Sequence, residues 1–152
     1  MQLHESMTAR LQERLNTLHS RGAGTIGDML NLSLVECDLE KGEFTMRCQT
    51  QEWMRNIAGT LHGGMCATLM DQAMGCVAYC AMPGEGIAPT IDLQVSYHRP
   101  LIPGEDVLIK VSMVSATKSL MYLASEAYMA SNPERICITS RATFFYKPMP
   151  IV

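Results

Sequence analysis

The sequence lacks the features that direct a protein to nucleic acids or membranes. No run of like charges in its 152 residues is longer than two, the formal net charge is −3, and the isoelectric point is near 5.8. Nucleic acids and anionic membranes are bound by basic patches or stripes. We therefore expect neither nucleic acid nor membrane as a partner.

Targeting and metal-binding patterns are also missing. Charged residues interrupt the first twenty residues, so the apolar core of a signal peptide is absent. The six cysteines show no paired spacing, and we expect a cytoplasmic protein with reduced, buried thiols. Cys76 and Cys80 are four residues apart, but no second Cys or His pair accompanies them. We expect no metal and no cofactor.

The chain contains no internal repeat, low-complexity tract or linker. Its length falls in the commonest range for one domain. We therefore predict a single domain over residues 1–152. Within it, residues 1–27 form an N-terminal helix and its connection, and residues 28–147 form the core.

Hydrophobic periodicity predicts two helices. From residue 7 to about residue 20, apolar residues recur at steps of three and four, which is typical of an amphipathic surface helix. From residue 61 to residue 82 nearly every residue is small or apolar, with Asp71 near the middle. A central Asp opposes membrane insertion by about 2.5 to 3.5 kcal/mol. This second segment is therefore predicted to be a buried helix wrapped by a sheet.

Alternating apolar residues predict six strands, at residues 30–34, 44–48, 91–97, 107–113, 121–129 and 136–144. The first two are expected to form a hairpin, and the third to have one buried face. Short connections between the last three indicate a meander-like antiparallel arrangement. The predicted class is α+β, with one helix packed on one face of an antiparallel sheet.

Asp71 is the residue that most needs an explanation. A carboxylate in an apolar helix is costly to desolvate unless it is paired, protonated or facing a cavity. Such groups are candidates for functional sites, although structural networks also bury acids. The helix pattern alone leaves both a catalytic and a structural role open.

His62, Gly63 and Gly64 begin the same helix. The first amides of a helix lack intrahelical acceptors and lie at the positive end of its dipole. Glycine lets a substrate carbonyl approach closely, so the Gly63 amide is a candidate oxyanion donor for acyl transfer. A tight turn at the glycines and a capping role for His62 are the structural alternatives.

Gly63 and Asp71 are eight residues apart, which is about 12 Å along a helix axis. Both cannot contact one reacting carbonyl, so one protomer cannot complete the site. Two such helices running antiparallel across a two-fold axis would bring Asp71 of one protomer to the amide end of the other. We therefore predict an obligate homodimer with two equivalent sites.

The run from Asn56 to Gly64, continued through residues 67–71, resembles the active-site signature of the PaaI-type hotdog-fold thioesterases. The resemblance covers about residues 28–147. It implies a hotdog fold, in which a long central helix is wrapped by a curved antiparallel β-sheet. It also implies an acyl-CoA thioesterase that hydrolyses a small acyl- or aryl-CoA to free acid and CoA. The expected assembly is a homodimer, with a homotetramer made of two dimers left open.

The resemblance also implies roles for five residues. Asp71 becomes the general base or nucleophile, and the Gly63 amide becomes the oxyanion donor. Asn56 orients the thioester or the attacking water, and His62 supports that geometry. The hydroxyl of Thr90 helps to place the water near the acid.

Gly64 and Arg99 are the predicted substrate-binding residues. Arg99 and Lys118 are candidates to meet the phosphates of CoA. Apolar residues of the long helix would line either a narrow aryl pocket or a longer alkyl tunnel: Met65, Met70, Ala73, Met74 and Gly75.

The same architecture also hosts dehydratases and acyl-CoA sensors without catalytic activity. A dehydratase would carry a differently placed catalytic histidine within its own helix signature, whereas this sequence has the HGG-to-Asp spacing. The alternative function is a non-catalytic acyl-CoA-binding or regulatory hotdog protein.

Overall fold

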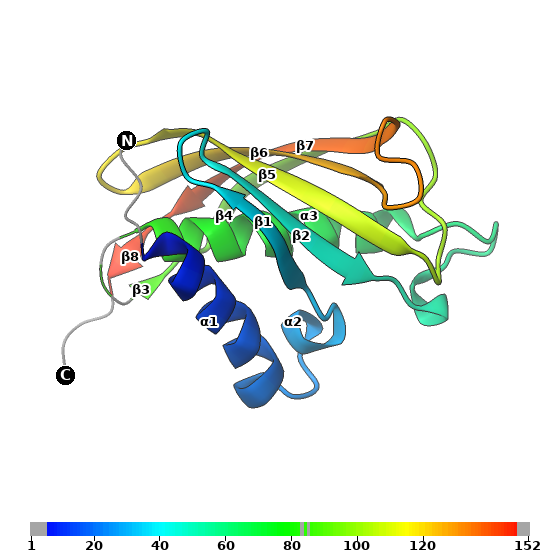
Figure 1. The fold of residues 1–152 in the computed structure, drawn as a ribbon, viewed down its shortest axis with the longest axis horizontal. Helices are drawn as coiled ribbons and strands as arrows, with labels where there is room; N and C mark the ends of the chain where they lie inside the picture. The colour runs from blue at the N-terminus through cyan, green and yellow to red at the C-terminus, as the bar shows by residue number, and fades with distance from the viewer. Residues whose placement is uncertain (1–5, 83, 85, 149–152) are drawn as a thin grey trace.

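A curved antiparallel sheet arches over one long helix (Figure 1). The computed structural model describes residues 6–82, 84 and 86–148. The elements in chain order are α1 (Met7–Arg21), α2 (Ile26–Met29), β1 (Ser33–Asp38), β2 (Glu43–Gln49), the 3-10 helix η1 (Glu52–Met54), α3 (Gly63–Ala81), β3 (Gly86–Ile87), β4 (Thr90–Tyr97), β5 (Asp106–Ala116), β6 (Leu120–Met129), β7 (Ile136–Phe145) and β8 (Lys147–Pro148). This arrangement confirms the predicted α+β class and hotdog fold.

The six main strands form one sheet in the order β1-β2-β5-β6-β7-β4. Every neighbouring pair is antiparallel, and the predicted meander of β5, β6 and β7 is confirmed. Two short strands, β3 and β8, pair in a separate ladder that the sequence did not predict. The two edges of the main sheet are therefore β1 and β4.

The core forms around α3. This helix is apolar on nearly every side, and its residues Leu69, Met70 and Met74 are fully buried against the inner face of the sheet. Burial of a side chain of this size contributes about 1.5–3 kcal/mol. The buried helix predicted over residues 61–82 is confirmed.

The N-terminal helix α1 packs on α3 and β1 through its apolar stripe (Figure 1). Met7, Leu11 and Leu15 are buried, and Leu18 is half-buried. The amphipathic helix predicted from the spacing of three and four residues is therefore confirmed. The helix α1 lies against the C-terminal half of α3, so polar side chains of α1 lie near the C-terminal end of α3.

The strand predicted at residues 30–34 is wrong in its first half. The short helix α2 comes directly before it, and Thr25 Oγ1 caps this helix by accepting from the Asp28 amide at 3.4 Å. Asn31 follows with a positive φ of 47°, a conformation that commonly ends helices. The strand begins only at Ser33. A helix end and a turn bury leucines here at the same alternate spacing that a strand would produce.

The strand β4 also differs from the prediction. Its alternation is correct, but within one chain neither face is fully buried. Leu93 and Val95 are half-buried, whereas Ile91 and Tyr97 are 56% and 54% exposed. The physical reason is position: β4 pairs with β7 on one side, and no described strand pairs with its other side.

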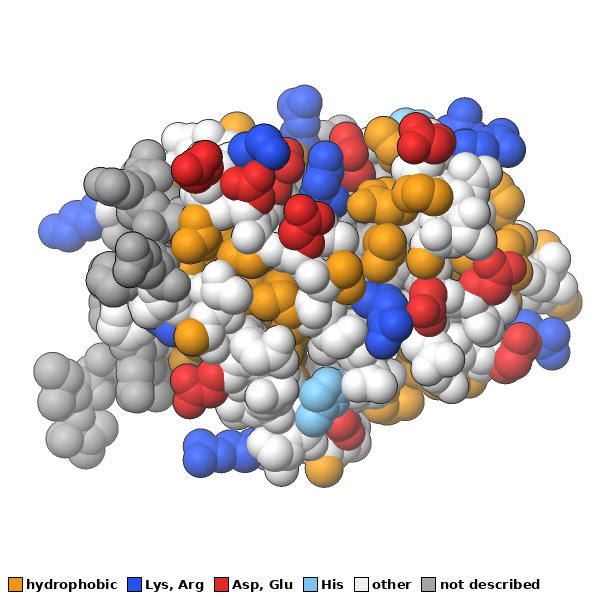
Figure 2. Space-filling model, in the orientation of Figure 1, with side chains coloured by type: hydrophobic (Ala, Val, Ile, Leu, Met, Phe, Trp, Pro, Cys, Tyr) orange, Lys and Arg blue, Asp and Glu red, His pale blue; other side chains and the backbone are white. Residues whose placement is uncertain are grey.

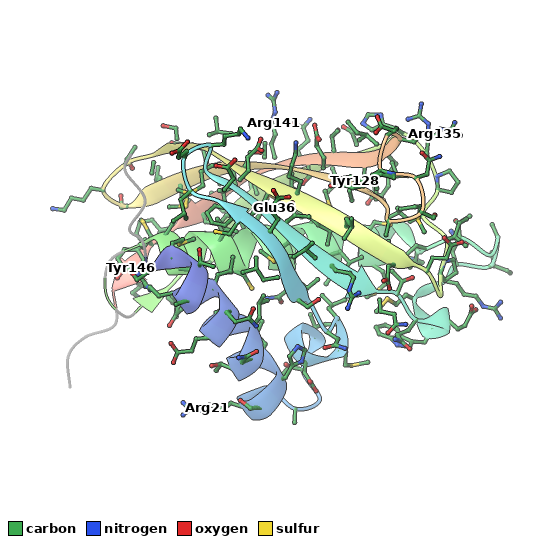
Figure 3. All side chains as sticks on the ribbon, viewed as in Figure 1. Arg21, Glu36, Tyr128, Arg135, Arg141 and Tyr146 are labelled. Atoms are coloured by element: carbon green, nitrogen blue, oxygen red, sulfur yellow. The ribbon has the colours of Figure 1, made fainter. Side chains whose placement is uncertain are left out.

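Charges of both signs are interspersed on the face of the molecule in Figure 2. Arg141 of β7, for example, stands on the side of the sheet away from α3 (Figure 3). Within the described part of the chain, no helix is long and apolar enough to cross a membrane. The same residues contain no group of three or more His, Cys, Asp or Glu that could hold a metal ion.

The six cysteines are free thiols, and all except the half-buried Cys37 are buried. Burial raises the pKa of Cys48 and Cys80 to about 12 and that of Cys66 to about 11. The pKa of Cys76 is raised by burial as well. These thiols therefore stay protonated at neutral pH and behave as small apolar groups.

Candidate active site

Asp71 lies near the middle of α3 and faces a cavity rather than the closed core. Thr90, the first residue of β4, donates a hydrogen bond from Oγ1 to Asp71 Oδ1 at 2.7 Å. We call the space beside this pair, about 290 Å³ in volume, the Asp71 cavity. The carboxylate is therefore both hydrogen-bonded and open to a ligand, two of the conditions under which an apolar helix can hold an acid. Other residues lining this cavity include Gly75, Tyr79, Ile87, Ala88 and Phe144.

His62 caps the N-terminus of α3. Its backbone is extended, with φ −61° and ψ 135°, and its Nδ1 accepts from the Gly64 amide at 2.9 Å. Because Nδ1 accepts, the neutral ring carries its proton on Nε2. His62 therefore has the capping role that was its structural alternative. The cap fixes the position of the helix N-terminus, where the oxyanion donor is expected.

Gly63 is the first residue of α3, and its two backbone groups differ. The carbonyl accepts a hydrogen bond from the Tyr97 hydroxyl at 2.7 Å. The amide has no acceptor within the residues that the structure describes. It therefore remains available at the positive end of the helix dipole, as an oxyanion donor must be.

The Gly63 end of α3 borders a second cavity of about 350 Å³, which we call the Gly63 cavity. Tyr97 forms part of its wall, and partial burial, followed by the nearby Cys66 thiol, raises the pKa of Tyr97 above its ordinary value. The phenol therefore stays protonated and keeps its hydrogen bond at neutral pH. Further lining residues are Asn56, Thr60, Cys66, Arg99 and Leu101.

Asn56 organises the loop that precedes α3. Its Oδ1 accepts from the amides of Ala58 and Thr60 at 2.9 and 3.2 Å, and its Nδ2 donates to Thr60 Oγ1 at 2.9 Å. Gly59 permits this tight loop with a positive φ of 83°. A side-chain amide has two N–H donors, so Nδ2 keeps a second hydrogen for a ligand at the cavity.

The predicted substrate-binding residues have different surroundings. Arg99 lines the Gly63 cavity, and its Nη1 donates to the Ile136 carbonyl at 2.7 Å. Gly64 is exposed, and its amide is already used by the helix cap. Lys118 lies in the β5–β6 connection and lines neither cavity.

The expectation for the acyl pocket is largely corrected. Met70, Ala73 and Met74 are fully buried in the core, because the sheet covers their side of α3. Met65 is half-buried and lines neither cavity. Of the five residues expected to line the pocket, only Gly75 borders the Asp71 cavity.

The structure brings the predicted site residues together in two groups. Thr90 and Asp71 share one cavity, whereas Asn56, Gly63 and Arg99 share the other. This division follows the eight-residue separation along α3, about 12 Å. One chain therefore presents the predicted site residues in two separate groups.

Among the cavity residues that sequence reasoning did not predict, two carry polar groups that bear on the chemistry. Tyr97 was placed only on an apolar strand face, and nothing in the pattern indicates that its hydroxyl reaches Gly63. Arg14, which lines the Asp71 cavity, had a usable signal. It stands three residues after Leu11 and four before Leu18, so it interrupts the apolar stripe of α1 with a charge.

Residues 58–136, just over half of the chain, match the family described as the Thioesterase superfamily. Human acyl-coenzyme A thioesterase 13 is 31% identical over 83 residues, which cover 53% of this chain and 57% of that protein. The match thus spans little more than half the length of this relative.

Solved structures share the fold. A crystal structure of mouse thioesterase superfamily member 2 aligns with a TM-score of 0.73 at 22% identity, covering 93% of this chain and 98% of that chain. The PaaI protein of E. coli aligns with a TM-score of 0.71 at 14% identity, covering 90% of this chain and 96% of that chain. At these identities the likeness establishes the architecture alone.

Proposed function

The chain belongs to the thioesterase superfamily, and from this premise we propose that it hydrolyses the thioester of a small acyl- or aryl-CoA, releasing the free acid and CoA. The observation that carries the proposal is the pair of complementary half-sites on α3. One offers a carboxylate held by a hydroxyl, at Asp71 and Thr90. The other offers an unused helix N-terminal amide at Gly63, beside Asn56.

A dimer built through β4 would join the half-sites. An open strand edge is a template for pairing with another chain, and β4 exposes apolar Ile91 and Tyr97 there. Thr90, at one end of β4, contacts Asp71, and Tyr97, at the other end, contacts Gly63. Antiparallel pairing of two β4 strands about a two-fold axis would therefore place Asp71 near Gly63 of the partner subunit.

In this arrangement the substrate carbonyl lies between the two subunits. The Gly63 amide, with the free Nδ2 hydrogen of Asn56 beside it, receives the charge that develops on the carbonyl oxygen. The Asp71 carboxylate takes a proton from the attacking water, or attacks the carbonyl itself, and Thr90 fixes its orientation. When water attacks, the C–S bond then breaks, the proton taken up by Asp71 passes to the departing CoA thiolate, and the free acid is released. When Asp71 attacks, the thiolate leaves an acyl-Asp71 anhydride, which water then hydrolyses, supplying the proton that the thiolate gains.

The first test follows release of free CoA from short, long and aromatic acyl-CoA thioesters by the wild type and by Asp71→Asn. We expect turnover of some esters and a loss of at least about a hundredfold in the variant, which keeps its melting temperature. A wild type that binds CoA esters without hydrolysing any would contradict the proposal and favour a regulatory acyl-CoA-binding protein.

The second test asks whether each site spans two subunits. Asp71→Asn and Gly63→Ala chains are unfolded together and refolded as a mixture. In a heterodimer one site carries both changes and the other carries neither, so about one quarter of wild-type activity should return after random mixing. If each site lay within one chain, every site would carry a change and the mixture would stay inactive.

A further inference from the structure

Arg14 of α1 reaches the Asp71 cavity from outside the predicted site. Its guanidinium lies over the ring of Tyr79, with Cζ 4.2 Å from the ring centroid. An arginine stacked on an aromatic face gains a cation–π interaction, and its orientation becomes fixed. Both residues line the cavity that contains Asp71.

One buried nitrogen of the Arg14 guanidinium has no polar partner. Its Nε is buried without a hydrogen-bond partner within residues 6–82, 84 and 86–148. No ion pair among these residues involves Arg14. By contrast Arg10, one turn earlier on α1, donates to the carbonyls of Met82 and Gly84 at 3.1 and 3.4 Å. A guanidinium has five N–H donors, and leaving a buried donor unpaired is costly.

The cavity connects this charge to the reacting end of the site. Asp71, Gly75 and Tyr79 stand four residues apart along one face of α3, so Asp71 and Tyr79 are about 12 Å apart along the axis. Gly75 between them has no side chain, and Ile87 and Phe144 contribute apolar surface to the lining. An acyl group placed beside Asp71 therefore has an open path past Gly75, with some apolar surface, toward the guanidinium.

We propose that Arg14 binds a carboxylate at the far end of the acyl group, so that the preferred substrates are CoA thioesters of short dicarboxylic acids. This inference rests on the proposed hydrolase function. A direct contact of about 3 Å between Asp71 and the carbonyl carbon, and a hydrogen bond of about 3 Å between Arg14 and the terminal carboxylate, leave about 6 Å of the axial distance, or roughly five carbon–carbon bonds. A six-carbon diacid fits that length.

The same guanidinium chemistry would also suit a phosphate of CoA. The cavity favours the acyl group, because its volume of about 290 Å³ is at the lower end of the range for small-molecule sites. Ile87, Ala88 and Phe144 add apolar surface to a lining that is otherwise mostly polar, so a short chain with a polar terminal group fits it better than a plain hydrocarbon chain.

The test compares adipoyl-CoA with hexanoyl-CoA, which have the same carbon number and differ by the terminal carboxylate. We expect the wild type to have the higher kcat/KM for adipoyl-CoA. Arg14→Met, which keeps a long apolar stem, should lower the adipoyl-to-hexanoyl ratio of kcat/KM by ten- to a hundredfold. Arg14→Lys keeps a charge over Tyr79 without the bidentate fork and should give an intermediate ratio.

Arg21→Met is the matched control, because it removes a charge from the same helix. Arg21 is exposed at the end of α1 and points away from the sheet (Figure 3). The ratio should be unchanged in this variant. Inhibition by free CoA, measured for every variant, distinguishes whether Arg14 binds the terminal carboxylate of the acyl group or a phosphate of CoA.

Three results would overturn the inference while leaving the hydrolase function intact. They are a wild type with no preference for adipoyl-CoA, an equal loss on both esters in Arg14→Met, and weaker inhibition by free CoA in that variant. The last would place the guanidinium on a CoA phosphate. Failure of the wild type to hydrolyse any ester would instead contradict the proposed function itself. If Arg14→Met does not fold, the preference of the wild type for adipoyl-CoA and the adipoyl-to-hexanoyl ratio of kcat/KM in Arg14→Lys still test the inference.

Discussion

The Thr90 hydroxyl donates to Asp71 Oδ1 at 2.7 Å and so joins the start of the edge strand β4 to the middle of α3. The bond leaves the second carboxylate oxygen of Asp71 without a partner among the described residues. An ionised carboxylate accepts through both oxygens, so one can be held while the other meets water.

Replacing Thr90 should therefore affect turnover more than binding. Thr90→Val removes the hydrogen-bond donor and keeps the shape of the side chain. We expect kcat to fall about tenfold with little change in KM, because about tenfold corresponds to the loss of one hydrogen bond to a charged group. Steady-state kinetics on the best thioester measures both constants. Thr90→Ser is the control and should retain most of the activity. Full turnover in Thr90→Val would show that the hydroxyl is dispensable.

The adjacent glycines at the start of α3 should separate activity from stability. A Cβ on Gly63 would lie 3.6 Å from the Tyr97 hydroxyl, an ordinary contact, whereas one on Gly64 would lie 3.1 Å from His62 Nδ1. Gly63→Ala should therefore fold normally and lose at least about tenfold in kcat, because its methyl group crowds the oxyanion amide. Gly64→Ala should cost about 1 kcal/mol of unfolding free energy by disturbing the cap. Urea unfolding and kinetics on both variants check this division, and the reverse pattern would contradict it.

His62 should matter first through its cap. His62→Ala leaves the Gly64 amide without its acceptor, and we expect a loss of about 1 kcal/mol in unfolding free energy. His62→Asn restores a side-chain acceptor and should recover most of that stability in chemical denaturation. If His62→Asn is as unstable as His62→Ala, the ring contributes by packing rather than by its hydrogen bond.

The buried thiols should make stability depend on alkaline pH. The pKa is about 12 for Cys48 and Cys80 and about 11 for Cys66 in the folded state, against an ordinary value of 9.0. A raised folded-state pKa means that the stabilisation is complete below pH 9 and is lost as the pH rises from 9 towards 12. We expect the unfolding free energy to fall by at least about 2 kcal/mol between pH 8 and pH 11.

Urea unfolding across that range measures the slope, and Cys80→Ala is the control. This variant has one buried thiol fewer, so its pH dependence should be shallower by about one proton. An unchanged slope would assign the effect to tyrosines and lysines instead.

Much of the fold could be predicted because its elements bury one side at a fixed period. The steps of three and four in α1, and the alternation in β5 to β7, survive into the structure for that reason. Prediction failed at Leu30 and Leu32, where a helix end produces the spacing of a strand. It also failed for the burial of Ile91 and Tyr97, because burial at a sheet edge depends on what lies beyond the chain.

The candidate site divides in a similar way. The separation of Gly63 from Asp71 follows from helix rise alone, and the two cavities agree with it. Thr90 was expected only through family resemblance, since nothing local to the sequence links it to Asp71. The contacts of Tyr97 and Arg14 depend on side-chain directions between elements that are distant in sequence.

The interior is rich in sulfur, and this bears on oxidative damage. Eight methionines and five cysteines are among the buried side chains. Conversion of a buried methionine to its sulfoxide puts a polar group into an apolar core, so each such event would be disruptive. Among the methionines that the structure describes, peroxide should first reach exposed Met29, and modification of the interior must wait until the protein opens. The rate at which peroxide inactivates the folded protein would thus report how often the core between the sheet and α3 becomes accessible to solvent.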